Sequence, residues 1–216
     1  MIVVIQCAAS KRPQAGYFRR ADGKKVLFVA DPARAPASSD VIYARPDDPA
    51  DGGATWREQV ARYNRTPDVN PFGLSRACEL YENQTYGELV RGFGLDNTMI
   101  LSAGWGLIPA RFLTPRYDIT FNASAASYVR RRKTEPYRDF CSLPEAKGPI
   151  VFFGGKEYVP LFASLTAQLD HRIVFYNSAS PPSAPGCSLR RFNTQTRTNW
   201  HYECARAFAA GTLDMS

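Results

Sequence analysis

The sequence predicts an α/β fold with three layers, α/β/α, in which helices cover both faces of a mainly parallel four-stranded sheet. Three observations support this prediction: four short apolar runs, helical patterns between them, and small or polar residues directly after each run. Runs that are apolar throughout are typical of strands buried on both faces. Strands that alternate with helices favour a parallel sheet.

The strands are predicted at Ile2–Gln6, Thr98–Ser102, Ile150–Phe153 and Arg172–Tyr176. Helices are predicted at residues 75–93, 124–133, 157–169 and 199–210. In the first helix the apolar side chains recur along one stripe. In the third, Pro160 lies near the first turn, where proline is tolerated.

Residues 13–70 do not follow this alternation. They begin with a predicted hairpin that turns at Asp22 and Gly23 and continue as a polar, proline-rich stretch. A loop of this length is either functional or disordered. We therefore expect one α/β domain over residues 1–216, with an insertion at 13–70 that lies over the sheet edge or the pocket mouth.

Composition limits the class of protein. The chain has 216 residues, 44% of them hydrophobic, which is enough for a sizeable core and argues against disorder. No apolar run approaches the roughly 20 residues of a membrane span, so we expect a cytoplasmic protein with no membrane partner. We also expect a monomer. The net charge of +7 favours a polyanionic partner such as DNA.

Several kinds of site are disfavoured by spacing. The five cysteines are scattered and only two histidines occur, so we expect no zinc site and reduced thiols. GGKEY after the third strand resembles an anion-binding turn, but neither GxxxxGK[ST] nor GxGxxG is present. ATP and NAD are therefore not expected, and we predict no cofactor. Two late histidines also disfavour a Ser–His or Cys–His hydrolase.

Ligands of parallel sheets bind beyond the carboxyl ends of the strands, so the residues that follow the strands predict the pocket. We expect the base-edge, backbone and stacking contacts to a substrate from Gln6, Cys7, Ser10, Gly104, Trp105, Gly155, Tyr158 and Asn177. Of these, Trp105 and Tyr158 are expected to stack on a base. Core packing is an equally open interpretation for Trp105, and a tight turn between strand and helix for the glycines.

Asp118 is the predicted catalytic carboxylate, together with Tyr117 and Ser102. It lies between Tyr117 and Ile119, and partial desolvation in such a setting makes a carboxylate a stronger base. Cleavage of an N-glycosidic bond builds positive charge on the sugar, which a carboxylate can stabilise. The alternative is an Asp that caps a helix or bonds its own turn.

Phosphate contacts are expected from clustered basic residues. These are Lys11, Arg12, Arg130, Arg131, Arg132, Lys133, Lys156, Arg190 and Arg191.

The sequence resembles a bacterial family with a C-x-x-S-K start, an "LY" segment and an LSA-x-x-GL…YD block, related to the YaaA-like proteins. The motif positions in this chain are Cys7, Ser10, Lys11, Leu80, Tyr81, Leu101, Ser102, Ala103, Gly106, Leu107, Tyr117 and Asp118. They span about half the chain. Arg116 stands between Pro115 and Tyr117, where the family usually has Pro-Tyr-Asp.

This resemblance implies a uracil-DNA-glycosylase-like fold. It also implies a metal-independent hydrolase that excises a modified base, glucosylated hydroxymethylcytosine, from phage DNA and leaves abasic sites, an anti-phage defence. Two alternatives stay open. One is an N-glycosidase of free nucleosides or nucleotides, and the other is a DNA-binding protein without catalysis.

Overall fold

The computed structural model describes residues 1–66, 69–144 and 148–213. Its central sheet has seven strands in the order β12-β11-β10-β1-β5-β6-β9. Their bounds are β1 (Ile2–Gln6), β5 (Thr98–Ser102), β6 (Gly106–Pro109), β9 (Phe140–Cys141), β10 (Ile150–Phe153), β11 (Arg172–Tyr176) and β12 (Ser188–Arg191). All neighbours pair in parallel except β5 and β6, which form an antiparallel hairpin.

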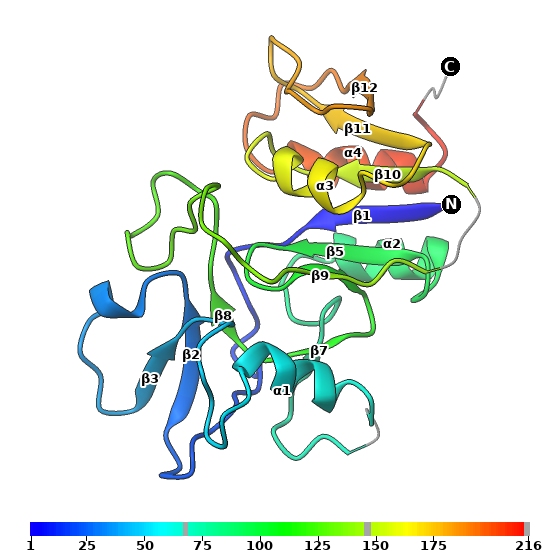
Figure 1. Cartoon of the computed structure of the whole chain (residues 1–216). Coiled ribbons are helices and arrows are strands. Elements are labelled where there is room, and N and C mark those ends of the chain that lie inside the picture. The colour runs from blue at the N-terminus through cyan, green and yellow to red at the C-terminus, as the bar shows by residue number, and fades with distance from the viewer. Residues whose placement is uncertain (67–68, 145–147, 214–216) are drawn as a thin grey trace.

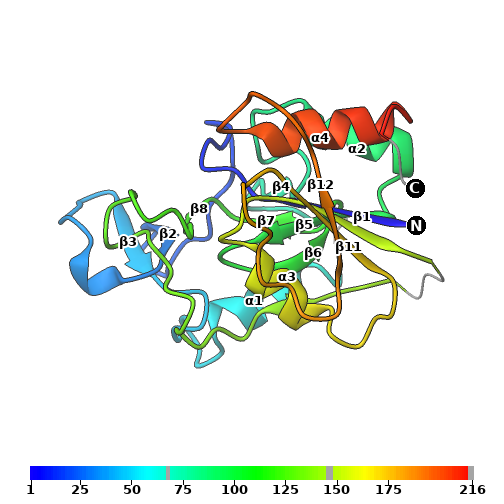
Figure 2. The same cartoon turned by 90° about the horizontal axis from the view of Figure 1, so that it is seen from above.

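Helices cover both faces of this sheet. These helices are α2 (Thr85–Phe93), α3 (Val159–Leu165) and α4 (Trp200–Ala209), whereas α1 (Trp56–Tyr63) belongs to the insertion. Figure 2 shows α2 and α4 side by side on one face and α3 on the other. The α/β class and the mostly parallel sheet are therefore confirmed, whereas the predicted number of four strands is wrong.

The four predicted strands are β1, β5, β10 and β11, with the predicted bounds. Val3, Val4 and Ile5 are fully buried, as expected for strands covered on both faces. The three additional strands gave weak signals. β6 begins at the second glycine of SAGWG, β9 has two residues, and β12 (SLRR) is mostly polar because it forms a sheet edge.

The predicted helices need correction. Only the second half of residues 75–93 is helical, since α2 begins at Thr85 and residues 75 and 76 form β4 (Ser75–Arg76) against β7 (Leu113–Thr114). Residues 124–133 form turns instead of a helix. The predicted helix at 157–169 is shortened to α3, and the one at 199–210 is confirmed as α4.

The insertion forms a small second sheet beside the main one (Figure 1). The insertion contributes β2 (Lys25–Val29) and β3 (Val41–Ala44), with a 3-10 turn at Pro32–Arg34 between them, and α1 follows β3. The third strand, β8 (Tyr117–Asp118), comes from outside the insertion and pairs with β2. The predicted turn at Asp22 and Gly23 is present, with Arg19 and Lys25 bridged across it. Residues 67 and 68 of the predicted insertion lie outside the described residues.

Gly106 is the glycine at which the hairpin between β5 and β6 depends on the absence of a side chain. Its φ is +87°, and a Cβ would lie 2.5 Å from the carbonyl oxygen of Phe140 and 2.7 Å from Cβ of Asp139. β9 therefore packs directly against the glycine backbone, and both the conformation and the space exclude other residues.

We predict that Gly106→Ala lowers the free energy of unfolding by about 3 kcal/mol or more, measured by urea denaturation. The matched control is Gly94→Ala. Gly94 has a φ of +84° with no atom within 4 Å of its Cβ position, so that substitution adds backbone strain alone. Equal losses for the two variants would contradict the steric argument.

Candidate functional site

Two buried arginines hold the SAGWG turn between β5 and β6. Arg57 of α1 donates to the carbonyl oxygens of Gly104 (3.0 Å) and Trp105 (3.3 Å). Arg131 donates to the carbonyl oxygen of Ala103 at 2.8 Å. Carbonyls in a buried turn need such partners, because an unpaired buried polar group is costly.

Each arginine is itself paired with a carboxylate in bidentate geometry. Arg57 contacts Asp47 at 2.6 and 3.3 Å, and Arg131 contacts Asp139 at 2.9 and 2.6 Å. Burial raises the pKa of Asp47, but the hydrogen bond and charge of Arg57 outweigh it, so the pKa lies below its ordinary value. The turn is thus joined to the insertion and to the segment before β9.

A group of buried hydroxyls lies beneath this turn. The Tyr117 hydroxyl lies 2.7 Å from that of Tyr81 and accepts a hydrogen bond from Ser102 Oγ at 2.9 Å. Ser102 Oγ in turn accepts from the backbone N–H groups of Gly104 and Trp105. Burial raises the pKa of Tyr117 well above its ordinary value, so the phenol stays protonated. Tyr117 and Ser102 are fully buried, and the geometry gives them a structural role.

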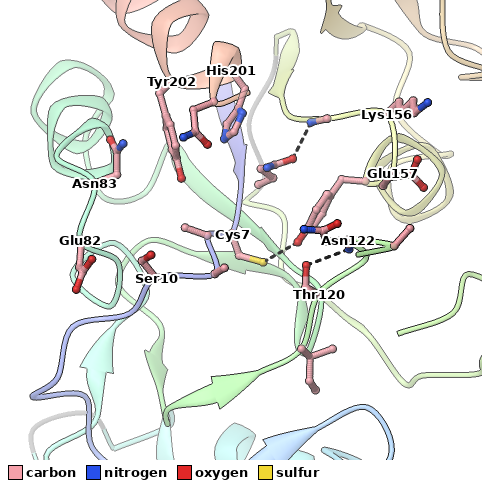
Figure 3. A pocket seen from close by; sticks show the side chains of 18 residues that line it. Cys7, Ser10, Glu82, Asn83, Thr120, Asn122, Lys156, Glu157, His201 and Tyr202 are labelled. Carbon is pink, nitrogen blue, oxygen red and sulfur yellow. Dashed lines mark hydrogen bonds between the residues drawn. The ribbon is translucent and has the colours of Figure 1, made fainter. Parts of the chain in front are cut away.

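A pocket of about 820 Å³ opens at the carboxyl ends of β1 and β10 (Figure 3). Pockets of this size enclose drug-sized ligands. A pocket therefore lies where the strand ends predicted one. It is lined by Gln6, Cys7, Ala8, Ala9, Ser10, Glu82, Asn83, Ile119, Thr120, Asn122, Ala123, Gly155, Lys156, Glu157, Tyr158, Asn199, His201 and Tyr202.

The predicted residues Gln6, Cys7, Ser10, Gly155 and Tyr158 all line this pocket. Gln6 Oε1 accepts from the backbone N–H of Gly155 at 2.6 Å, which fixes the direction of the amide. Cys7 Sγ lies 3.3 Å from the Tyr158 hydroxyl and accepts from the Ala103 N–H. The thiol thus connects the pocket floor to the SAGWG turn.

Trp105 and Gly104 are not available to a ligand, so their predicted role in substrate binding is wrong. The Trp105 ring is fully buried and packs edge-on against Phe28, with centroids 5.1 Å apart. Gly104 is buried, and a Cβ there would lie 3.2 Å from side-chain atoms of Tyr117 and Ile119. The turn approaches the core of its own protein closely, instead of a substrate.

Asp118 is not among the residues that line the pocket. It is half-buried on β8, opposite Val29 of β2, and its charge acts on Lys11. Lys11 is buried with Nζ 4.4 Å from the centre of the Tyr117 ring, and burial lowers its pKa despite the attraction of Asp118. Asn177 lies in a separate pocket with Arg191, where its amide donates to the Thr196 carbonyl.

The predicted phosphate-binding residues are divided by burial. Arg131 and Lys11 are buried, so their expected contact with DNA is wrong. Lys133 is exposed but pairs with Glu157 at 2.7 Å. Lys156 is exposed at the pocket. The remaining predicted residues are exposed or half-buried elsewhere: Arg12, Arg130, Arg132, Arg190 and Arg191.

Sequence reasoning missed Glu82, Asn83, Asn122, His201 and Tyr202, all of which line the pocket. Glu82 and Asn83 follow Tyr81 in the "LY" segment, which is paired with the chain after β1 through a bridge between Lys11 and Tyr81. Their position directly after the LY pair at residues 80 and 81 was an available signal in the sequence. His201 and Tyr202 begin α4, and nothing local marks that end of the helix as facing a pocket.

No protein-family model, no curated protein and no solved structure matches this chain. Within the described residues, no group of three His, Cys, Asp or Glu side chains is placed to hold a metal ion. No described helix is long and apolar enough to cross a membrane.

The lowered pKa of Asp47 predicts acid sensitivity. A carboxylate whose folded pKa is depressed stabilises the protein above its unfolded pKa of about 4, and this contribution is lost as the pH falls through the folded value. We predict that Asp47→Asn lowers the free energy of unfolding at neutral pH and makes it vary less below about pH 4. Urea denaturation across the acid range measures both effects.

The control for this prediction is Asp51→Asn. Asp51 pairs with Arg20 at 3.1 Å on the surface, where the two side chains are 37% and 49% exposed. We expect this variant to keep the wild-type acid profile, because exposed pairs contribute little. An unchanged acid profile in Asp47→Asn would show that the pair with Arg57 does not carry the effect.

Proposed function

We propose that this chain is a DNA glycosylase that hydrolyses the N-glycosidic bond of a modified base. The observation that carries the proposal is the composition of the pocket at the carboxyl ends of β1 and β10. It combines a carboxylate, Glu82, with amide side chains and the aromatic rings of Tyr158 and Tyr202. An enzyme that acts on a base in DNA flips it into such a pocket and recognises it by stacking and by hydrogen bonds.

Glu82 is the best candidate for the catalytic carboxylate in place of Asp118. It is exposed at the pocket, and no ion pair of its carboxylate is found in the described part of the chain. The other carboxylate of the lining, Glu157, is paired with Lys133. The bridge between Lys11 and Tyr81 fixes the backbone just before Glu82, which supports a defined position for the side chain.

The reaction places specific demands on this carboxylate. The bond between the sugar carbon and the base nitrogen breaks, its electron pair leaves with the base, and positive charge develops on the sugar. A negative Glu82 would stabilise that charge and take a proton from the water that adds to the sugar carbon. Amides of Asn83, Asn122 and Gln6 would bind polar edges of the base.

The pocket volume supports a bulky substrate. About 820 Å³ leaves room for a base with a large substituent, such as the glucosylated hydroxymethylcytosine that the resemblance implies. Excision of that base from phage DNA inside the cell would be a defence. DNA is preferred to a free nucleotide because of the net charge of +7, with exposed cations at Lys156, Arg12 and Arg132.

We predict that Glu82→Gln lowers the rate of base release at least about 100-fold, because the amide cannot balance the charge on the sugar. DNA affinity should stay within about twofold, since the change is nearly isosteric. Mass spectrometry of bases released from plain, uracil-containing, hydroxymethylated and glucosylated phage DNA measures the rate and names the base.

Glu79→Gln is the matched control, because Glu79 is exposed near Arg76 and does not line the pocket. Asp118→Asn, tested in parallel, should keep most of the activity. Loss of activity in Asp118→Asn with retention in Glu82→Gln would return the catalytic role to Asp118. Base release from free nucleotides but not from DNA would favour the nucleotide N-glycosidase, and DNA binding without release the non-catalytic protein.

We also predict that Lys156→Glu weakens DNA binding, because one phosphate contact is lost. The plot of log affinity against log salt should become less steep, with the magnitude of its negative slope reduced by about 1. Fluorescence anisotropy of a labelled duplex across a salt series measures both quantities. The control is Lys24→Glu, which makes the same charge change at the exposed turn beside Gly23. Equal effects of the two variants would indicate non-specific attraction by net charge alone.

A further inference from the structure

The N-terminus of α4 faces the candidate pocket. Asn199, His201 and Tyr202, all from the first turn or its cap, line it. Asn199 has a left-handed φ of 62°, and its side chain makes no capping hydrogen bond. The Tyr202 N–H bonds to the Asn199 carbonyl, whereas those of Trp200 and His201 have no partner within the described residues. Free N–H groups at a helix start attract anions.

His201 provides a second and independent observation. This residue is only 4% exposed, and its Nε2 has no hydrogen-bond partner among the described residues. A buried polar atom without a partner is costly, so its retention needs an explanation. Figure 3 shows the ring extending from α4 toward the end of β1, among the side chains that line the pocket.

In its neutral form, His201 can donate a hydrogen bond to an anion but carries no positive charge. Burial lowers its pKa to about 4, so the imidazole is neutral near neutral pH. A neutral imidazole has one N–H, which can donate one hydrogen bond. The acidic residue of the same helical turn, Glu203, does not line the pocket and accepts from the hydroxyls of Thr194 and Thr196 at 2.9 Å each.

We propose that the start of α4 and His201 form a subsite for the phosphate group of a nucleotide. The Trp200 and His201 N–H groups and the His201 imidazole belong to one helical turn at the pocket, and together they would supply donors for several acceptor oxygens of a phosphate. The subsite extends the proposed function, on which it rests for the identity of the nucleotide. The phosphate can come from the backbone of DNA or from a free nucleotide, and the experiment separates these sources.

The first measurement is phosphate binding itself, which needs no catalysis. Inorganic phosphate is titrated into the wild-type protein while the imidazole signals of the two histidines are followed by NMR. We expect the His201 signal to shift with saturation and the signal of His171, which is exposed and outside the pocket, to stay in place. Absence of a saturable His201 shift would overturn the proposal, whatever the result for base release.

Two variants test the geometry. His201→Phe removes the N–H and keeps a ring of similar size, and we expect about tenfold weaker phosphate binding. Asn199→Asp is nearly isosteric and places a carboxylate at the helix start, where it competes with phosphate and favours the helix. That variant should unfold no more easily than wild type yet lose phosphate binding. His171→Phe is the matched control. Unchanged binding in both subsite variants would overturn the proposal.

The same variants then separate the two sources. If Asn199→Asp weakens binding of a duplex or single-stranded oligonucleotide about tenfold but leaves binding of a nucleoside unchanged, the subsite holds a DNA phosphate. If it weakens a nucleoside 5′-monophosphate and not the oligonucleotide, the subsite holds a free nucleotide. The subsite would be refuted if wild type bound a nucleoside and its nucleotide equally well and Asn199→Asp did not change binding of the oligonucleotide. The glycosylase reaction would then still be judged separately, from base release.

Discussion

The rest of the structure depends on the contact between two buried guanidinium groups and three carbonyl oxygens of one turn. Arg57 and Arg131 satisfy the carbonyls of Ala103, Gly104 and Trp105, and each is neutralised by its own carboxylate. A buried arginine without such a partner would be strongly unfavourable, so the ion pairs and the turn are stable only together. This arrangement connects the insertion, the hairpin and the segment before β9, which are distant in sequence.

The turn that the two arginines hold supports the pocket but is not exposed in it. Cys7 accepts from the Ala103 N–H on one side and contacts the Tyr158 hydroxyl on the other, so the pocket floor rests against the turn. Tyr81 contacts Tyr117 below the turn and immediately precedes Glu82 at the pocket. Most residues of the C-x-x-S-K, LY and LSA-x-x-GL…YD motifs therefore fall into two groups. One contributes to the pocket lining, and the other supports it from within the core.

How far the sequence could predict this arrangement differs between elements. The four strands and the location of the pocket followed from local patterns, because buried parallel strands are continuously apolar and ligands bind at their carboxyl ends. The roles of Trp105 and Arg131 did not, because an aromatic ring or an arginine has the same local signature whether it contacts a ligand or the interior. The helix at 75–93 was predicted to be too long. Residues 75–84 have helical spacing of apolar residues, but they form a strand and turns that pair with residues more than 30 positions away in the sequence. The LY pair directly before Glu82 was a weak sequence signal, and the pairing of Lys11 with Tyr81 explains why Glu82 lies at the pocket.

The two edges of the central sheet bear on how the protein behaves at high concentration. An edge strand offers unpaired backbone groups to any other chain, and long apolar edges promote aggregation. Here one edge is β12, with Arg190 and Arg191 among its four residues, and the other is β9, which has only two. Neither edge offers a long apolar template for a second molecule. The arginines of β12, whatever they contribute to binding, thus also favour colloidal stability in concentrated solution.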